Sequence, residues 1–376
     1  MSFLSTYPTG AIKLLLASPA GFPPSGTTAT ATVAETLYIS NLVAIIFAAV
    51  ISTFALVFRL YTKLVLIKQW NIEDLLLIPA WILLVYYIAE GEIAMHAGAG
   101  RHMWNITFTQ FYSALYHINV ASILYCIIVG LLKVAILLQY LRIFVPNRNS
   151  NKGLRYVLYA TITATVLFYV IITFCTIFIC FPREAYYNPY VKGNCLGWQG
   201  MAKVVAIFAI VSDFALLIIP IFPIRKLHMA RKKKVLIGCF FAIGLIDCIA
   251  SVVRAYYTWY LIGSTDISWN SVGMGIWAAL EMSFGVVVVC LPVSPRFYKH
   301  LRERSNALLT SWKLSRSQDT DRSKGSSSTT NLSSSISPTR PHFSSFHYGL
   351  EKDYDIQRPE GAILVKEEYK VEEFLV

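Results

Sequence analysis

The fold is decided by residues 201–262, which read MAKVVAIFAIVSDFALLIIPIFPIRKLHMARKKKVLIGCFFAIGLIDCIASVVRAYYTWYLI. Two apolar runs flank a basic segment, RKLHMARKKK, and each run is long enough to cross a hydrocarbon core of about 30 Å as a helix. A segment with so many positive charges stays on the cytosolic side of a membrane. The pattern therefore predicts two membrane-spanning helices that are joined in the cytosol.

The whole chain has the composition of a membrane protein. Its 376 residues are 56% hydrophobic and 14% charged, and the mean hydropathy is +0.54, whereas soluble domains carry about 25% charged residues. The net charge of +12 is concentrated beside the apolar runs, so membrane topology explains it and a nucleic-acid partner is not expected. No apolar run alternates with a period of two, which excludes a transmembrane barrel.

Seven apolar runs predict an all-α membrane protein, a bundle of seven transmembrane helices within residues 37–295. The expected spans cover about residues 37–58, 75–95, 118–141, 154–181, 201–223, 235–262 and 272–291. Residues 1–36 are interpreted as a flexible extracellular tail. Residues 296–376 are interpreted as a cytosolic tail that begins with an amphipathic helix and continues as a disordered segment rich in Ser and Thr.

The Lys and Arg residues of the loops predict the orientation. The loops after the first, third and fifth spans hold thirteen of them, whereas the loops on the other side hold four. Cytosolic loops carry the excess of positive charge. We therefore expect the N-terminus outside and the C-terminus in the cytosol, in the plasma membrane in preference to an endomembrane.

The predicted outer loops contain two further signals. Asn105-Ile-Thr is a glycosylation sequon, and its modification stays open because it lies near the membrane. Cys180 and Cys195 flank the loop between the fourth and fifth spans, in a compartment that permits disulfides, and we expect them to pair. No Cys/His group has metal-ligand spacing, so no metal site is expected.

Five charged side chains lie deep inside the predicted spans, where burial of a charge is costly. They are Lys133, Asp213, Asp247, Arg254 and Glu281. At about 1.5 Å per residue, each aspartate lies about 18 Å from one end of its span, and Glu281 lies near the centre of the seventh. Three interpretations stay open: paired charges that hold helices together, a polar chamber for a ligand or an ion, and a proton relay.

Several motifs, in this order and at this spacing, resemble those of the fungal rhodopsin-like integral membrane proteins, a family of seven-helix proteins. They are WNIEDLLLIPA, GAGRHMW, LLKVAILLQYLRIF, FICFPREAYYNPYVKGNC, SDFALLIIPIFPIRKL and IASVVRAYY, and the resemblance covers about residues 37–300. The residues carried over by these motifs are Asp74, Gly100, Arg101, Trp104, Lys133, Arg142, Cys180, Cys195, Asp213, Pro220 and Arg254.

The resemblance implies a receptor-like protein for an unknown small molecule, coupled to a heterotrimeric G protein or another cytosolic signalling partner. Other members lie beside secondary-metabolite genes, which implies the alternative of a small-molecule transporter or an accessory membrane protein of a biosynthetic pathway. No cofactor is expected, because a retinal Schiff base requires a lysine in the last span, and residues 272–291 contain none. An enzyme is not expected either, since no HExxH or GxSxG motif occurs.

Overall fold

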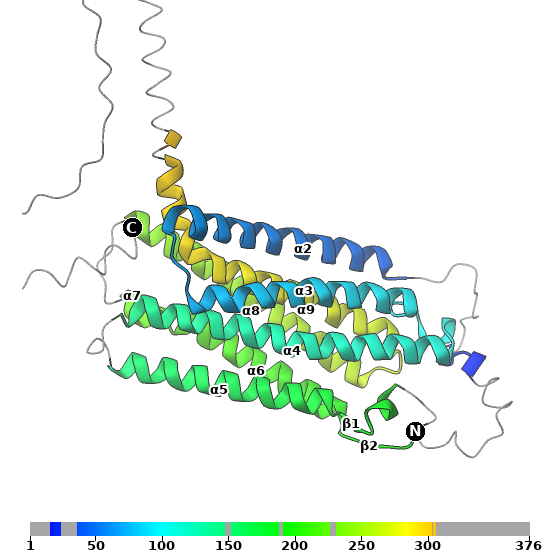
Figure 1. The fold of residues 1–376 in the computed structure, drawn as a ribbon. Helices are drawn as coiled ribbons and strands as arrows, with labels where there is room; N and C mark the ends of the chain where they lie inside the picture. The colour runs from blue at the N-terminus through cyan, green and yellow to red at the C-terminus, as the bar shows by residue number, and fades with distance from the viewer. Residues whose placement is uncertain are drawn as a thin grey trace, which may run out of the picture. The chain divides into compact units, whose positions relative to one another are not determined.

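A computed structural model describes residues 16–23, 36–146, 152–187, 191–225, 231–302 and 304–305, with the backbone alone at 224–225, 231–237 and 239–240. The predicted tails lie mostly outside these residues, as does much of the basic segment after the fifth span. Within the described residues, seven helices are long and apolar enough to cross a membrane, and their arrangement as a bundle is visible in Figure 1. The expected all-α, multi-pass fold is therefore confirmed.

The long helices are separated by short elements at the two ends of the bundle. The long helices are α2 (Tyr38–Tyr61), α3 (Ile72–Ala97), α4 (Phe108–Phe144), α5 (Lys152–Ile177), α6 (Trp198–Ile218), α8 (Arg231–Gly263) and α9 (Ile267–Cys290). The short elements are η2 (Thr62–Ile67), η3 (Met103–Asn105), β1 (Cys180–Phe181), η4 (Arg183–Tyr186), β2 (Asn194–Cys195), α7 (Ile221–Arg225) and η5 (Leu291–Val293).

Helices α4 and α9 form the centre of the bundle. Helix α4 packs against α3, α5 and α9, and α9 also packs against α2 and α8, while α6 packs mainly on α8. Small residues allow close approach: a Cβ on Gly285 of α9 would lie 3.1 Å from Leu132 of α4. On the periphery, large apolar side chains such as Phe54 of α2 and Ile171 of α5 are exposed, and membrane lipid is the medium that covers them.

The third span begins ten residues before its expected start at 118. The Thr107 hydroxyl accepts a hydrogen bond from Gln110 N (3.3 Å), and Gln110 Oε1 accepts one from Thr107 N (3.0 Å), which caps the helix N-terminus. The added segment contains polar residues, so hydropathy alone placed the start too late. At 37 residues, α4 is about 55 Å long and extends beyond the hydrocarbon core.

The fourth and fifth spans differ from expectation at their ends. Helix α5 stops at Ile177, four residues before the expected end at 181, because Cys180–Phe181 form β1 and pair antiparallel with β2. Helix α6 stops at Ile218, and the chain resumes a helical path in α7 after Pro220, which lacks the N–H that would continue the helix. The apolar run through both elements nevertheless counts as one span.

Candidate functional site

We call the end of the bundle that carries β1 and β2 the disulfide end. The opposite end carries residues 68–71, which connect η2 to α3 (Figure 1). At the disulfide end lies a cavity of about 540 Å³, within the range of about 300–1,000 Å³ that is common for small-molecule sites. Its walls come from α2, α3, α4, α5, α6, α8 and α9 and from the loop between α5 and α6.

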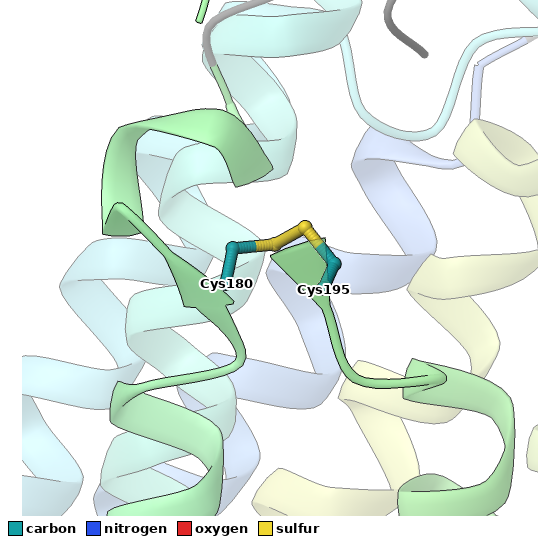
Figure 2. Close-up of a disulfide and its surroundings, with 2 residues drawn as sticks. All are labelled: Cys180 and Cys195. Carbon is teal, nitrogen blue, oxygen red and sulfur yellow. A yellow bond between two sulfur atoms is a disulfide. The ribbon is translucent and has the colours of Figure 1, made fainter. Parts of the chain in front are cut away.

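The loop between α5 and α6 forms part of the cavity wall. Cys180 and Cys195 face each other across the two-residue strands and are joined by a disulfide, with Cα atoms 4.0 Å apart (Figure 2). Both cysteines line the cavity, as do Tyr186 and Lys192 from the same loop. Burial raises the pKa of the Tyr186 phenol to about 12, so this group stays uncharged near neutral pH.

A polar trio lies at the inner side of this cavity. Arg254 of α8 donates from Nε to Glu281 Oε2 of α9 (2.6 Å), and Tyr125 of α4 donates from its hydroxyl to Glu281 Oε1 (2.8 Å). The guanidinium also lies 4.6 Å from the centroid of the Tyr125 ring. Arg254 and Tyr125 line the cavity, and Arg254 is 4% exposed. The trio joins three helices and places a cation at the cavity wall.

Lys133 of α4 lies outside the cavity lining and pairs with α6. Its Nζ is 2.7 Å from Asp213 Oδ1, and it donates to Ser212 Oγ (2.6 Å) and to the carbonyl oxygen of Ala209 (3.0 Å). The contact with Asp213 is an ion pair and the other two are hydrogen bonds, and all three partners lie in α6. The arrangement matches the interpretation of paired charges that hold helices together.

Asp247 of α8 is the one predicted intramembrane charge for which the described residues offer no ion-pair partner. Its side chain is buried, Oδ1 has no hydrogen-bond partner there, and it does not line the cavity. The structure therefore sorts the five predicted residues: Arg254 and Glu281 belong to the cavity trio, Lys133 and Asp213 form a pair, and Asp247 belongs to neither ion pair.

A buried charge cluster at the opposite end was missed by the sequence reasoning. Arg59 of α2 donates from Nε to Asp74 Oδ1 of α3 (2.7 Å), and Lys63 Nζ lies 3.0 Å from Asp74 Oδ2. Arg59 also donates to the carbonyl oxygen of Val289 in α9. We call Arg59, Lys63 and Asp74 the inner charge cluster. The sequence analysis counted Arg59 and Lys63 only as loop charges. The acid at the start of the next span, Asp74, is the signal that could have indicated this cluster.

Next to this cluster, α3 is tied to α4. Glu73 Oε1 accepts a hydrogen bond from Arg142 Nη1 at 2.8 Å. The Glu73-Asp74 pair that precedes the second span therefore contacts two different helices. Asp74 holds α2 and Glu73 holds α4.

A second missed feature lies in the loop between α3 and α4. The His102 ring stacks between Trp104 and Trp269, with centroid distances of 4.3 and 4.1 Å, and its Nδ1 lies 2.5 Å from Asp266 Oδ2. This stack joins the loop to the start of α9. Gly100 is needed in the same loop because its φ is +78° and a Cβ there would lie 2.6 Å from Met95 Cε. The sequon Asn105 is the last residue of η3 and is half-buried.

Residues 58–300 match the fungal rhodopsin domain, which is more than half of the chain. The chain belongs to the fungal rhodopsin family. Fugralins biosynthesis cluster protein 2 of Gibberella zeae is 26% identical to it over 264 residues, 68% of this chain and 64% of that protein. A SAT4 family membrane protein of Emericella nidulans is 27% identical over 239 residues, 62% of this chain and 60% of that protein.

This member of the fungal rhodopsin family thus spans less than two thirds of the length of these relatives. No solved structure is significantly similar to it. The side chains do not fit retinal: α9 contains no lysine, and Lys133 is held by Asp213 and does not line the cavity.

Proposed function

We propose that this fungal rhodopsin family member is a receptor- or sensor-like protein that binds a small molecule in the cavity at the disulfide end. The cavity, with the Arg254–Glu281–Tyr125 trio at its inner side, is the observation that carries the proposal. Binding is favoured over catalysis because no Asp, Glu or His is among the described residues that line the cavity, and the lining therefore supplies no carboxylate or imidazole as a general base. The protein is accordingly proposed not to be an enzyme.

Helix α9 supplies a path from this cavity to the opposite end. Glu281 of the trio and Val289, whose carbonyl oxygen accepts from Arg59, lie eight residues apart, about 12 Å along the helix axis. A shift of α9 on ligand binding would therefore change the contacts of the inner charge cluster. Coupling of this kind needs a rigid element that both sites contact, and α9 meets that requirement.

The proposed orientation places the disulfide end outside the cell and the opposite end in the cytosol of the plasma membrane. The excess of Lys and Arg at the opposite end supports it. The disulfide supports it as well, because disulfides persist on the outside. In this orientation Asn105 lies outside, where its sequon can be glycosylated, and a heterotrimeric G protein is the proposed partner at the cytosolic end.

Two single-cysteine variants test the orientation. Gly197 precedes α6 at the disulfide end and Gly153 is the second residue of α5 at the opposite end; both are exposed, and a Cβ at either meets no atom within 4 Å. With a membrane-impermeant maleimide on intact protoplasts, we expect Gly197→Cys to be labelled and Gly153→Cys to be labelled only after permeabilisation. The reverse pattern would contradict the orientation. The wild type gives the background from its other cysteines.

Affinity purification tests the proposed partner. From host membranes, the tagged full chain is expected to recover a Gα subunit, and the recovery should fall when a non-hydrolysable GTP analogue is added. Recovery equal to that of an unrelated multi-pass protein with the same tag would count against a G protein. The Asn105→Gln variant serves as a matched control, because its change lies at the other end of the bundle.

A second candidate is a small-molecule transporter or an accessory protein of a secondary-metabolite pathway. The name of the Gibberella zeae relative, which places that protein in a biosynthesis cluster, is the observation that favours it. This candidate predicts that deletion of the gene changes how metabolites are distributed between cells and medium. An unchanged distribution, measured by mass spectrometry of both fractions, would leave the receptor proposal as the better one.

A further inference from the structure

The chemistry of the cavity lining narrows the kind of molecule that it can hold. Most of the lining is apolar, with side chains such as Phe111, Leu115, Ile118, Val205 and Leu261. Removal of apolar surface from water favours the binding of an apolar molecule in such a cavity. The body of the ligand is therefore apolar.

The charged side chains of the lining argue against a cationic ligand. Among the described residues they are Lys192, which is exposed on the loop, and Arg254, which is buried; no acidic side chain lines the cavity. A ligand ammonium group would find no carboxylate to pair with, because Glu281 is already engaged by Arg254 and Tyr125. Its desolvation would go uncompensated.

The hydroxyl groups of the cavity are mostly used within the protein. Seven of them donate to an oxygen of the chain: Ser122 to Ile118, Thr176 to Ile172, Thr258 to Arg254, Ser268 to Gly98, Ser271 to Ser268, Tyr87 to Gly275 and Tyr125 to Glu281. Two lining residues keep a buried nitrogen without a partner among the described residues, namely Arg254 at Nη2 and Asn41 at Nδ2. The unpaired polar groups of the site are therefore hydrogen-bond donors, and the ligand group that would pair with them is an acceptor.

The charge balance at Arg254 decides between an anionic acceptor and a neutral one. Both carboxylate oxygens of Glu281 are engaged, one by Arg254 and one by Tyr125, so the guanidinium is already neutralised. A ligand carboxylate would add a second negative charge beside a single buried positive charge, at a high desolvation cost. A carbonyl oxygen can accept a hydrogen bond from the guanidinium and adds no net charge.

We propose that the cavity holds an uncharged, largely apolar molecule with a carbonyl group, and that Arg254 donates a hydrogen bond to the carbonyl oxygen. This inference rests on the proposed function and names the class of its ligand. Asn41, on the α2 side of the cavity, supplies a second donor for a molecule with a second acceptor.

Three fluorescent naphthalenes test the proposal with the full chain in lipid nanodiscs. Prodan carries a neutral ketone, 6-(dimethylamino)-2-naphthoate carries a carboxylate in its place, and 2-(dimethylamino)naphthalene carries neither. We expect saturable binding of prodan above the background of empty nanodiscs. The other two probes should bind about tenfold more weakly, as expected for loss of a hydrogen bond to a charged donor or for burial of an uncompensated charge.

Two double variants identify the donor. Arg254→Met with Glu281→Gln removes the cavity ion pair without leaving a lone charge, and it should weaken prodan binding about tenfold while leaving the carbonyl-free probe unchanged. Lys133→Met with Asp213→Leu removes a buried pair outside the lining and should keep the wild-type affinity for prodan. A melting curve for each variant reports whether it folds.

The possible outcomes test the proposed ligand class and the proposed receptor function separately. Tighter binding of the carboxylate than of the ketone, or an unchanged prodan affinity in the Arg254 variant, would overturn the inference and leave a small-molecule cavity in place. Loss of prodan binding in both double variants would overturn the role of Arg254. Absence of saturable binding for all three probes would overturn the inference and would also remove the cavity from the support for a receptor.

Discussion

Replacement of Asp74 by alanine is expected to lower the free energy of unfolding by about 3–5 kcal/mol, because it leaves two buried cations without their carboxylate. Arg59 and Asp74 are 1% and 2% exposed, and Lys63 shares the same carboxylate. The carboxylate also accepts from Asn71 N (3.1 Å) at the start of α3, so the variant loses one of the two hydrogen bonds of the capping box as well. Unfolding in mixed detergent micelles at increasing SDS fraction measures the change.

Glu73 is the matched control for this prediction. It precedes Asp74 in the chain, but its partner Arg142 is 35% exposed and can be solvated once the carboxylate is gone. We expect Glu73→Ala to cost about 1 kcal/mol or less. Equal losses for the two variants would contradict the role assigned to the inner charge cluster.

The second large effect is expected at the pair between α4 and α6. Lys133→Met leaves Asp213 buried without its cation and should destabilise the protein by about 3–5 kcal/mol, whereas the double variant with Asp213→Leu should recover most of this loss. The side chains are 5% and 2% exposed, so water cannot replace the missing partner. The same SDS titration gives both values.

The double variant distinguishes the interpretations of this pair. If Lys133 and Asp213 only hold helices together, the double variant keeps its function along with its stability. A double variant that is stable but gives no cellular response would instead indicate that the charges act in the conformational change, as in a proton relay. Stability as low as in the single variant would contradict the pairing itself.

Hydropathy and charge were sufficient to predict the seven spans, because only helices satisfy the backbone in lipid and because about 20 apolar residues cross it. The ends of the spans depend on helix caps and strand pairing, and the average hydropathy of a segment does not detect these. The cap at Thr107 starts α4 early, and the strand at Cys180 ends α5 early. The first of these signals was present in the sequence as a Thr and a Gln three residues apart.

The partners of the buried charges were not predictable. Helical rise places Lys133, Asp213 and Asp247 at their depths, but it does not say which helix faces which. Lys133 could have met either aspartate, and the packing of α4 and α6 gives it Asp213. Arg254 and Glu281 were both singled out, yet their pairing across α8 and α9 follows only from the tertiary structure.

We propose that a small molecule bound at the disulfide end changes the state of the opposite end of the bundle. The most direct measurement is the cAMP response of the host organism to organic-solvent extracts of its own culture medium and to prodan-type ketones. Three strains are compared: the wild type, a gene deletion, and a strain with Arg254→Met and Glu281→Gln at the native locus. We expect a response in the wild type that is lost in the other two strains, while the variant protein still reaches the membrane. A response of equal size in the wild type and the deletion strain would contradict it.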